Sequence, residues 1–255
     1  MLTRHLNQGR RWLLSAACVA LLAGCGARGL VRPDLAGNNK EAPKQVLVVP
    51  ADFVITEITF GKTEERVVSA ERKASKTFTQ HVQDLGVSKE NGKERSFDLI
   101  DFDQLTQDEQ ETVLQHRALF ATMVSQMLLV KEDAVDAWAT KAKYFDYTLG
   151  AGMADLAKAH QLDRALFVVG KDKVRSTSRK VFDAVTSVLP IGESLSSQPA
   201  AVVLGVVELQ TGNILMFDSD MAKRKALTDD DDVKAMAEAV LTDFRRTIKP
   251  RDGSK

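Results

Sequence analysis

The chain has 255 residues, of which 35 are basic and 35 acidic, and it contains 4 histidines and 2 cysteines. The first 24 residues hold three arginines and no acid, so the remainder has 32 basic and 35 acidic residues, a net charge of −3. A mildly acidic chain has no electrostatic basis for binding nucleic acid, and its length fits one domain with short extensions.

Residues 1–24 have the layout of a secretory signal peptide. Arg4, Arg10 and Arg11 give a positively charged start, residues 12–24 are mostly apolar, and the run ends in small residues. This run is shorter than the roughly 20 apolar residues that span a bilayer of about 30 Å. We therefore predict a segment that is removed. Plain secretion with cleavage nearby and an uncleaved anchor are the alternatives.

The stretch Leu22-Ala23-Gly24-Cys25 resembles the lipobox of bacterial lipoproteins. The resemblance implies cleavage between Gly24 and Cys25, a diacylglycerol on the Cys25 thiol, and an acyl group on the new amino terminus. The usual inner-membrane retention signal is an aspartate after the cysteine. Gly26 stands there, which implies transfer to the outer membrane, with the domain on its periplasmic face. Several acyl chains on one residue give stable anchoring, whereas a single chain is marginal.

Cysteine usage fits this prediction. Cys18 lies within the signal peptide, so Cys25 is the only thiol that remains, and lipidation consumes it. The folded part then has no disulfide, no cysteine-ligated metal and no cysteine nucleophile.

Apolar runs predict the strands of a sheet. Continuous runs, typical of strands buried on both faces, cover 46–50, 165–169 and 200–209. Shorter or alternating stretches cover 54–59, 97–102 and 213–217. We expect 54–59 to continue the first strand past a bulge at Pro50, and the last two strands to form a hairpin turned at Thr211-Gly212.

Helical periodicity predicts four helices, over 64–85, 106–131, 150–160 and 229–248. Thr106 and Glu109 have the spacing of a capping box at the start of the second helix. Residues 132–143 either extend that helix or begin another. For 175–199 we expect a helical turn or two and then a loop.

These elements predict an α/β fold, with a mixed sheet, a C-terminal β-hairpin and flanking amphipathic helices. We assign residues 45–250 to a single periplasmic domain. The segment 25–44 is rich in glycine, proline, asparagine and charge, and it predicts a flexible tether with a reach of roughly 25 Å.

The order of elements resembles a periplasmic α/β domain of envelope lipoproteins. That group includes the curli-secretion lipoprotein, the outer-membrane activators of penicillin-binding proteins and the N-terminal domain of TolB-type proteins. The matching pieces are 46–50, 97–100, 163–168 and 206–215, the last ending a hydrophobic strand in a Thr-Gly turn. The resemblance implies a shared scaffold with many roles, so it defines no single function. The chain lacks the long alternating insertions that would build a curli-type pore wall.

The sequence shows no catalytic constellation. His81, His116 and His160 each stand alone on a predicted helix, without a metal-ligand spacing such as H-E-x-x-H. No G-x-S-x-G occurs. We therefore predict a protein that is not an enzyme and has no cofactor.

Four consecutive acids, Asp229, Asp230, Asp231 and Asp232, begin the last predicted helix. Carboxylates in the first turn cap a helix and favour its dipole. Clustered carboxylate oxygens also suit a cation such as calcium. We predict capping and keep a cation site as the alternative.

The leading hypothesis is a lipoprotein held in the outer membrane through Cys25. Its domain would bind another envelope protein, as a non-enzymatic accessory in assembly, secretion or cell-wall regulation. The alternatives are a periplasmic domain that binds a small molecule or cation, and a hydrolase with a dispersed site.

Overall fold

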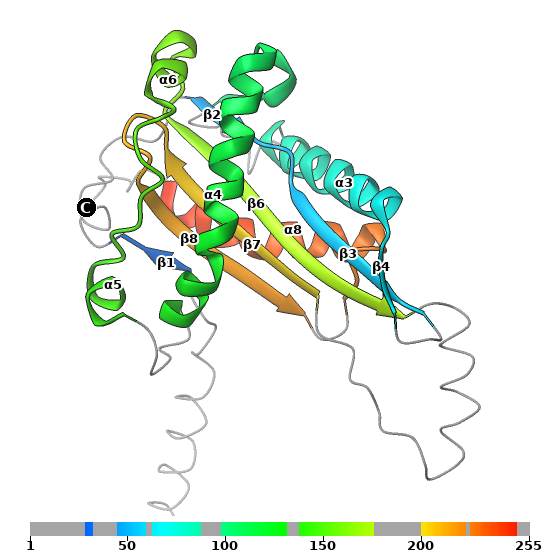
Figure 1. Ribbon diagram of the computed structural model, residues 1–255. Helices are drawn as coiled ribbons and strands as arrows, with labels where there is room; N and C mark the ends of the chain where they lie inside the picture. Colours follow the sequence, from blue (N-terminus) through cyan, green and yellow to red (C-terminus); the bar gives the residue numbers. More distant parts are fainter. Residues whose placement is uncertain are drawn as a thin grey trace, which may run out of the picture.

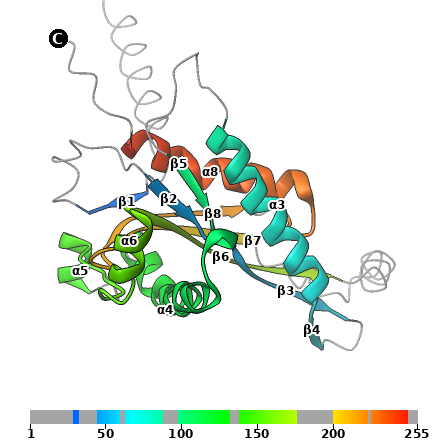
Figure 2. The same cartoon turned by 90° about the horizontal axis from the view of Figure 1, so that it is seen from above.

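The computed structural model describes residues 29–32, 45–59, 63–87, 98–131, 138–175, 200–222 and 225–248. These residues form an eight-stranded mixed sheet with helices on both faces (Figures 1 and 2). The strands are β1 Leu30–Val31, β2 Gln45–Val48, β3 Asp52–Ile58, β4 Glu64–Arg66, β5 Asp98–Asp101, β6 Arg164–Arg175, β7 Ala200–Glu208 and β8 Ile214–Ala222. The helices are α3 Val68–Val87, the 3-10 turn η1 Phe102–Gln104, α4 Gln107–Lys131, α5 Ala139–Tyr144, α6 Ala154–His160 and α8 Asp230–Ile248. The predicted α/β class is confirmed.

Strand β6 is the centre of the sheet. On one side it pairs antiparallel with β7, which continues into the antiparallel pair with β8. On the other side it pairs parallel with both β2 and β3. β5 then pairs parallel with β2, and β4 pairs antiparallel with β3. The mixed sheet and the hairpin of β7 and β8 agree with the prediction.

The central strands are buried on both faces, which explains their continuous apolar runs. Successive side chains of a strand point to opposite faces. Val46 and Val48 therefore enter the core beneath α3 and α8, while Leu47 and Val49 enter the core beneath α4 and α6. Figure 2 shows these two helix layers on opposite sides of the sheet.

The predicted bulge at Pro50 is confirmed by the strand register. Val48 lies opposite Leu166 and Asp52 lies opposite Val169. The three residues 49–51 therefore face only two residues of β6, which is the one-residue excess of a bulge. Proline fits there because it has no N–H to donate to a ladder.

Three predicted boundaries were wrong, and one of them is that of the helix predicted over 150–160, which begins only at Ala154. The helix predicted over 64–85 begins only at Val68, because Glu64–Arg66 pairs with the end of β3 as the polar edge strand β4. The strand predicted over 213–217 continues to Ala222, because it stays in register with β7 as far as Ala200. Residues 132–137 and 176–199 lie outside the described residues, and α5 shows that the segment 132–143 contains a second helix.

The segment 25–44, predicted as a flexible tether, contains β1. Leu30 lies opposite Phe217 and Val31 lies opposite Met216 in an antiparallel pair with β8, and the Arg32 amide donates to the Leu215 carbonyl at 3.0 Å. Leu30 and Val31 are therefore part of the sheet and not of a flexible tether, because these two apolar residues pair with the edge strand β8. The signal peptide 1–24, Cys25 and the rest of the segment lie outside the described residues.

The capping box that begins α4 is confirmed. The Thr106 amide donates to Glu109 Oε2 at 2.8 Å, and the Glu109 amide donates to Thr106 Oγ1 at 3.4 Å. His160, at the end of α6, lies 2.7 Å from Glu109 Oε1. The hydrogen bonds from Thr106, followed by that from His160, lower the pKa of Glu109 to about 2.

We expect Glu109 to contribute to acid sensitivity. Its pKa is below the ordinary 4.5, so its contribution to stability is present above that pH and is lost as the pH falls toward about 2. Thermal melting across this window checks the expectation, with Glu109→Gln losing less melting temperature on acidification than the parent. Parallel losses in both proteins would contradict it.

Candidate functional site

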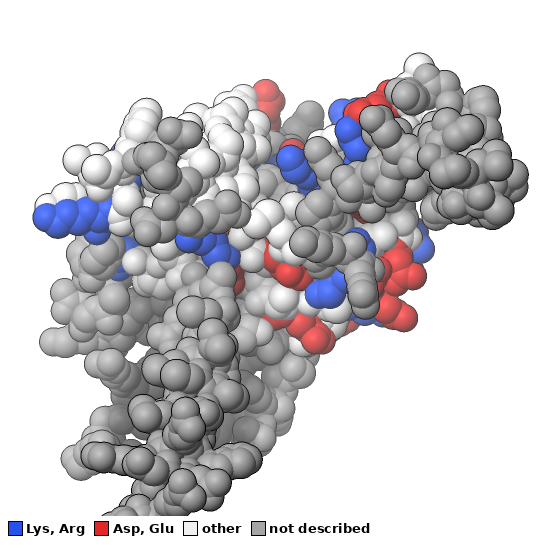
Figure 3. Space-filling model, turned by 90° about the horizontal axis from the view of Figure 1, so that it is seen from below, with Lys and Arg blue, Asp and Glu red and all other residues white. Residues whose placement is uncertain are grey.

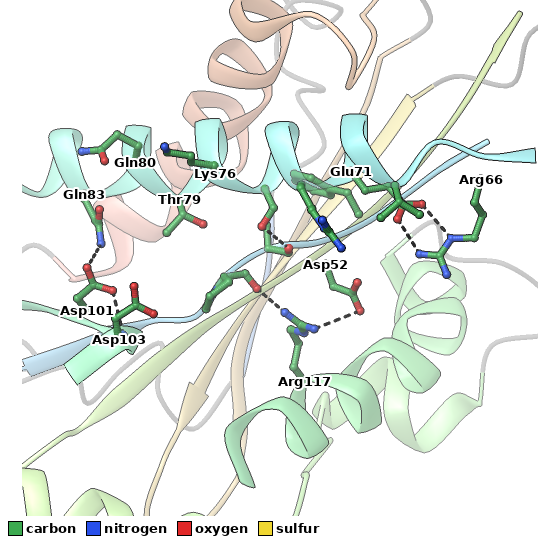
Figure 4. Close-up of a pocket in the computed structure, with 16 residues that line it drawn as sticks. Asp52, Arg66, Glu71, Lys76, Thr79, Gln80, Gln83, Asp101, Asp103 and Arg117 are labelled. Atoms are coloured by element: carbon green, nitrogen blue, oxygen red, sulfur yellow. Dashed lines mark hydrogen bonds and ion pairs between the residues drawn. The ribbon is translucent and has the colours of Figure 1, made fainter. Parts of the chain in front are cut away.

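A cleft of about 560 Å³ lies between α3 and the start of β3, with Arg117 of α4 at its floor (Figure 4). Its charged lining is balanced, with four cationic and four acidic side chains. These are Arg66, Arg72, Lys76 and Arg117, and Asp52, Glu71, Asp101 and Asp103. The sequence carried no motif for this cleft, because its walls come from segments far apart in the chain.

Ion pairs hold the end of the cleft near β4. Arg66 donates to both carboxylate oxygens of Glu71, at 3.0 and 2.8 Å, and the Ile55 amide donates to the same carboxylate at 3.0 Å. The hydrogen bond from Arg66 lowers the pKa of Glu71, so this carboxylate stays ionised. An ionised, doubly bound carboxylate is a structural support for β3 and not a general acid.

Arg117 joins α4 to the Pro50 bulge. Its Nη1 donates to the Pro50 carbonyl at 2.7 Å and its Nη2 lies 3.6 Å from Asp52 Oδ2. Burial lowers the pKa of Arg117. Its Nε and the Thr79 hydroxyl are buried without a hydrogen-bond partner among the described residues. The bulged carbonyl, which strand pairing leaves open, is satisfied by this guanidinium.

Two further polar side chains of the cleft make hydrogen bonds within the fold. The Ser75 hydroxyl donates to the Ala51 carbonyl at 2.6 Å, and Asp101 accepts from Gln83 at 3.1 Å. Its described lining contains neither histidine nor cysteine. The prediction that the protein is not an enzyme stays a prediction.

The four aspartates at the start of α8 have separate partners. Asp229 is the N-cap, accepting from the amides of Asp231 and Asp232 at 3.0 and 3.1 Å, so the predicted capping is confirmed. Asp230 lies 2.9 Å from Lys73 Nζ, and the hydrogen bond from this lysine lowers its pKa. Within the described residues, no group of three or more His, Cys, Asp or Glu side chains is placed to hold a metal ion. The cation alternative stays a prediction.

The other two aspartates of the cluster and two of the histidines make contacts within the fold. Asp232 accepts from the Ala226 amide at 2.9 Å, and Asp231 lies 3.7 Å from Lys234. His81 lies 3.3 Å from Glu238, linking α3 to α8, and His116 lies 2.7 Å from a carbonyl of its own helix. These contacts join α3 to α8, lie within a single helix, or hold α8 to the segment that precedes it.

The outer side of α4 is a surface that the sequence analysis missed. Residues 118–130 contain no charged side chain, although α4 lies on the outside of the sheet (Figure 1). Four side chains point inward and are buried, namely Val113, Phe120, Met127 and Val130. The opposite side exposes uncharged residues that we call the α4 outer surface: Ala118, Leu119, Thr122 and Ser125.

Helix α4 is long and apolar enough to cross a membrane by length and composition. Its packing assigns it to the domain instead. Phe120 lies over Gly205 of β7, where an added Cβ would come within 2.3 Å of the Phe120 ring, and the ring stands 6.0 Å from that of Phe167. Glycine at this position lets α4 approach the sheet closely.

No protein-family model matches this chain, and no curated protein matches its sequence. The solved structures that are similar to it include two from Paraburkholderia phytofirmans: a single-residue variant of the PelC dodecamer and the PelC dodecamer itself. They are 10% and 11% identical to the chain, cover 79% and 85% of it and 87% and 94% of their own lengths, and have a TM-score of 0.31 in each case. At this TM-score the likeness carries no functional conclusion. Membership of the group that includes the curli-secretion lipoprotein stays a prediction.

Proposed function

We propose that this protein is an outer-membrane lipoprotein, anchored through Cys25, whose periplasmic α/β domain binds another envelope protein without catalysing a reaction. The anchoring is supported by the lipobox Leu22-Ala23-Gly24-Cys25. The binding role is supported by one observation above all, the α4 outer surface. A helix on the outside of a domain ordinarily carries charged residues opposite its apolar stripe.

The chemistry of this surface suits a protein partner. Leu119 is 43% exposed, and Met123, one turn further along the same side of the helix, is only partly buried. Charged residues are depleted, and methionine is enriched, in the cores of protein interfaces. A helix of 25 residues is about 38 Å long, which suits an interface of standard size of about 800 Å² per partner.

Affinity capture from solubilised envelopes tests the proposal with two matched variants. Leu119→Arg places a cation on the α4 outer surface, and Val68→Arg makes the same kind of change at an apolar residue that is 46% exposed on the opposite side of the sheet. Burying an uncompensated cation in an interface costs several kcal/mol. We therefore expect Leu119→Arg to reduce capture by at least about tenfold, and Val68→Arg to leave it unchanged.

The control also distinguishes the surface from the cleft, because Val68 lines the cleft. Loss of capture with Val68→Arg and not with Leu119→Arg would move the binding site to the cleft and contradict the proposal. Unchanged melting temperatures of both variants show that the domain is intact.

A further inference from the structure

Strand β1 fixes how near the domain stands to its lipid anchor. Only residues 26–28, the anchor linker, separate Cys25 from Gly29 in the sequence. A chain spans at most about 3.6 Å per residue, so the Cα atoms of Cys25 and Gly29 are at most about 14 Å apart in any conformation. This step rests on the proposed lipidation of Cys25. A domain attached so closely has one end near the lipid.

The point of attachment belongs to a defined end of the fold. Leu30 packs against the core that includes Phe145 and Phe217. A Cβ added at Gly29 would lie 3.2 Å from Asp218 Cβ, and Asp218 in turn accepts from Lys131 at the end of α4. The chain therefore enters the sheet where α4 ends.

Helix α5 lies beside β1 at this same end (Figures 1 and 2). Phe145, directly after α5, stands with its ring centroid 6.4 Å from that of Phe217, whose strand partner is Leu30. Trp138, which immediately precedes the helix, is 62% exposed, and Tyr144 at its end is 51% exposed. The α5 segment thus shows two large aromatic side chains to the outside.

These side chains have the chemistry of a membrane interface. Tryptophan and tyrosine place an apolar ring in the lipid and a polar group at the headgroups. Lys143 lies with its ammonium 4.9 Å from the centre of the Tyr144 ring, and Lys141 pairs with Asp146 at 2.9 Å. Long lysine side chains keep their charge at the headgroups while their stems cover apolar surface.

Figure 3 views the molecule from the side on which α5 and the end of α4 lie. Of the described surface, white, uncharged atoms with basic residues at their margin lie at the upper left of this face, whereas most acidic residues lie in the centre and toward the right. An uncharged area with basic side chains at its margin suits phospholipid headgroups better than the acidic side does.

We propose that the α5 segment, with Trp138 and Tyr144, rests in the headgroup layer of the membrane that holds the anchor. The short linker and β1 together make this the only end of the described fold that the anchor brings to the lipid surface. The α4 outer surface then projects away from the sheet and stays accessible to a protein partner.

Tryptophan fluorescence of the native, lipidated protein tests this seating. The chain has two tryptophans, and Trp12 is removed with the signal peptide, so Trp138 is the sole reporter. The protein is placed in vesicles of phosphatidylethanolamine and phosphatidylglycerol, with and without bromine on the acyl chains. We expect a blue-shifted emission that loses at least about half its intensity in brominated vesicles, as for a residue at the interface.

A variant with a long glycine-serine insertion after Arg28 is the control. It should float with the vesicles as the parent does and lose most of the quenching, because the longer linker lets the domain leave the surface. Flotation without quenching in the parent, or equal quenching in both, would overturn the proposal and leave lipidation intact. A parent that does not float would instead refute the proposed anchoring, and the seating with it.

Discussion

Replacing Cys25 with serine is expected to abolish lipidation completely and to leave the protein unprocessed by the lipoprotein pathway. The modified group is a thiol, and a hydroxyl is a far weaker nucleophile at neutral pH. Cys25 is the only cysteine outside the predicted signal peptide, so no second residue can take its place. The domain should still fold, because Cys25 precedes Gly29, the first described residue.

Metabolic labelling with palmitate and the larger mass of the unprocessed protein measure this effect. Cys18→Ser is the matched control, since it makes the same substitution at the only other cysteine. We expect full labelling of the control and none of Cys25→Ser. Unchanged labelling of Cys25→Ser would refute the lipobox assignment.

Replacing Lys131 with methionine is expected to cause a large loss of stability. Lys131 Nζ lies 2.5 Å from Asp218 Oδ1 and donates to the Ser219 hydroxyl at 3.0 Å. The two charged side chains are only 6% and 8% exposed. Removing one partner of a buried ion pair costs about 3–5 kcal/mol. Methionine keeps the length and apolar stem of the lysine.

Urea unfolding of a double-mutant cycle measures this contribution. Lys131→Met combined with Asp218→Asn removes both charges, and we expect the pair of changes to recover most of the loss caused by Lys131→Met alone. A double variant as unstable as Lys131→Met would show that the loss comes from packing and not from charge. The pair joins α4 to β8 beside β1, so its loss would also loosen the end of the domain nearest the anchor.

The parts of the fold that follow from local chemistry were predictable. The apolar runs around Leu47, Phe167 and Val203 are buried on both faces, and no solvent-facing alternation competes with that pattern. Thr106 and Glu109 lie within one turn of each other, so their capping contacts need no tertiary information. Asp229 caps α8 for the same local reason.

Features set by distant partners were not predictable. Periodicity predicts that Glu64–Arg66 begins a helix. In the structure this segment is a strand, because it pairs with the edge of β3. Leu30 and Val31 are two apolar residues in a polar segment, and only the free edge of β8 makes them a strand. These cases show tertiary pairing overriding local propensity.

The candidate sites likewise differ in whether local sequence or distant partners determine them. The aspartate cluster was visible in the sequence. In the structure its side chains cap α8, pair with lysines or accept from the Ala226 amide. The cleft unites Asp52, Arg66 and Arg117, which no local motif connects. The α4 outer surface did leave a trace, since residues 118–130 carry no charge. That stretch was interpreted only as the apolar stripe of an amphipathic helix, because periodicity alone does not separate a core face from an interface.

Photo-cross-linking from the α4 outer surface tests the binding role most directly. A benzophenone amino acid replaces Leu119 in the native anchored protein in living cells, and replaces Lys234, on α8 at the opposite side of the sheet, as the control. We predict a discrete cross-linked product from position 119 that contains a different envelope protein, and no such product from position 234. If position 119 gives no cross-link, or only a cross-link to a second copy of this chain, the proposal that this surface binds a different envelope protein is contradicted.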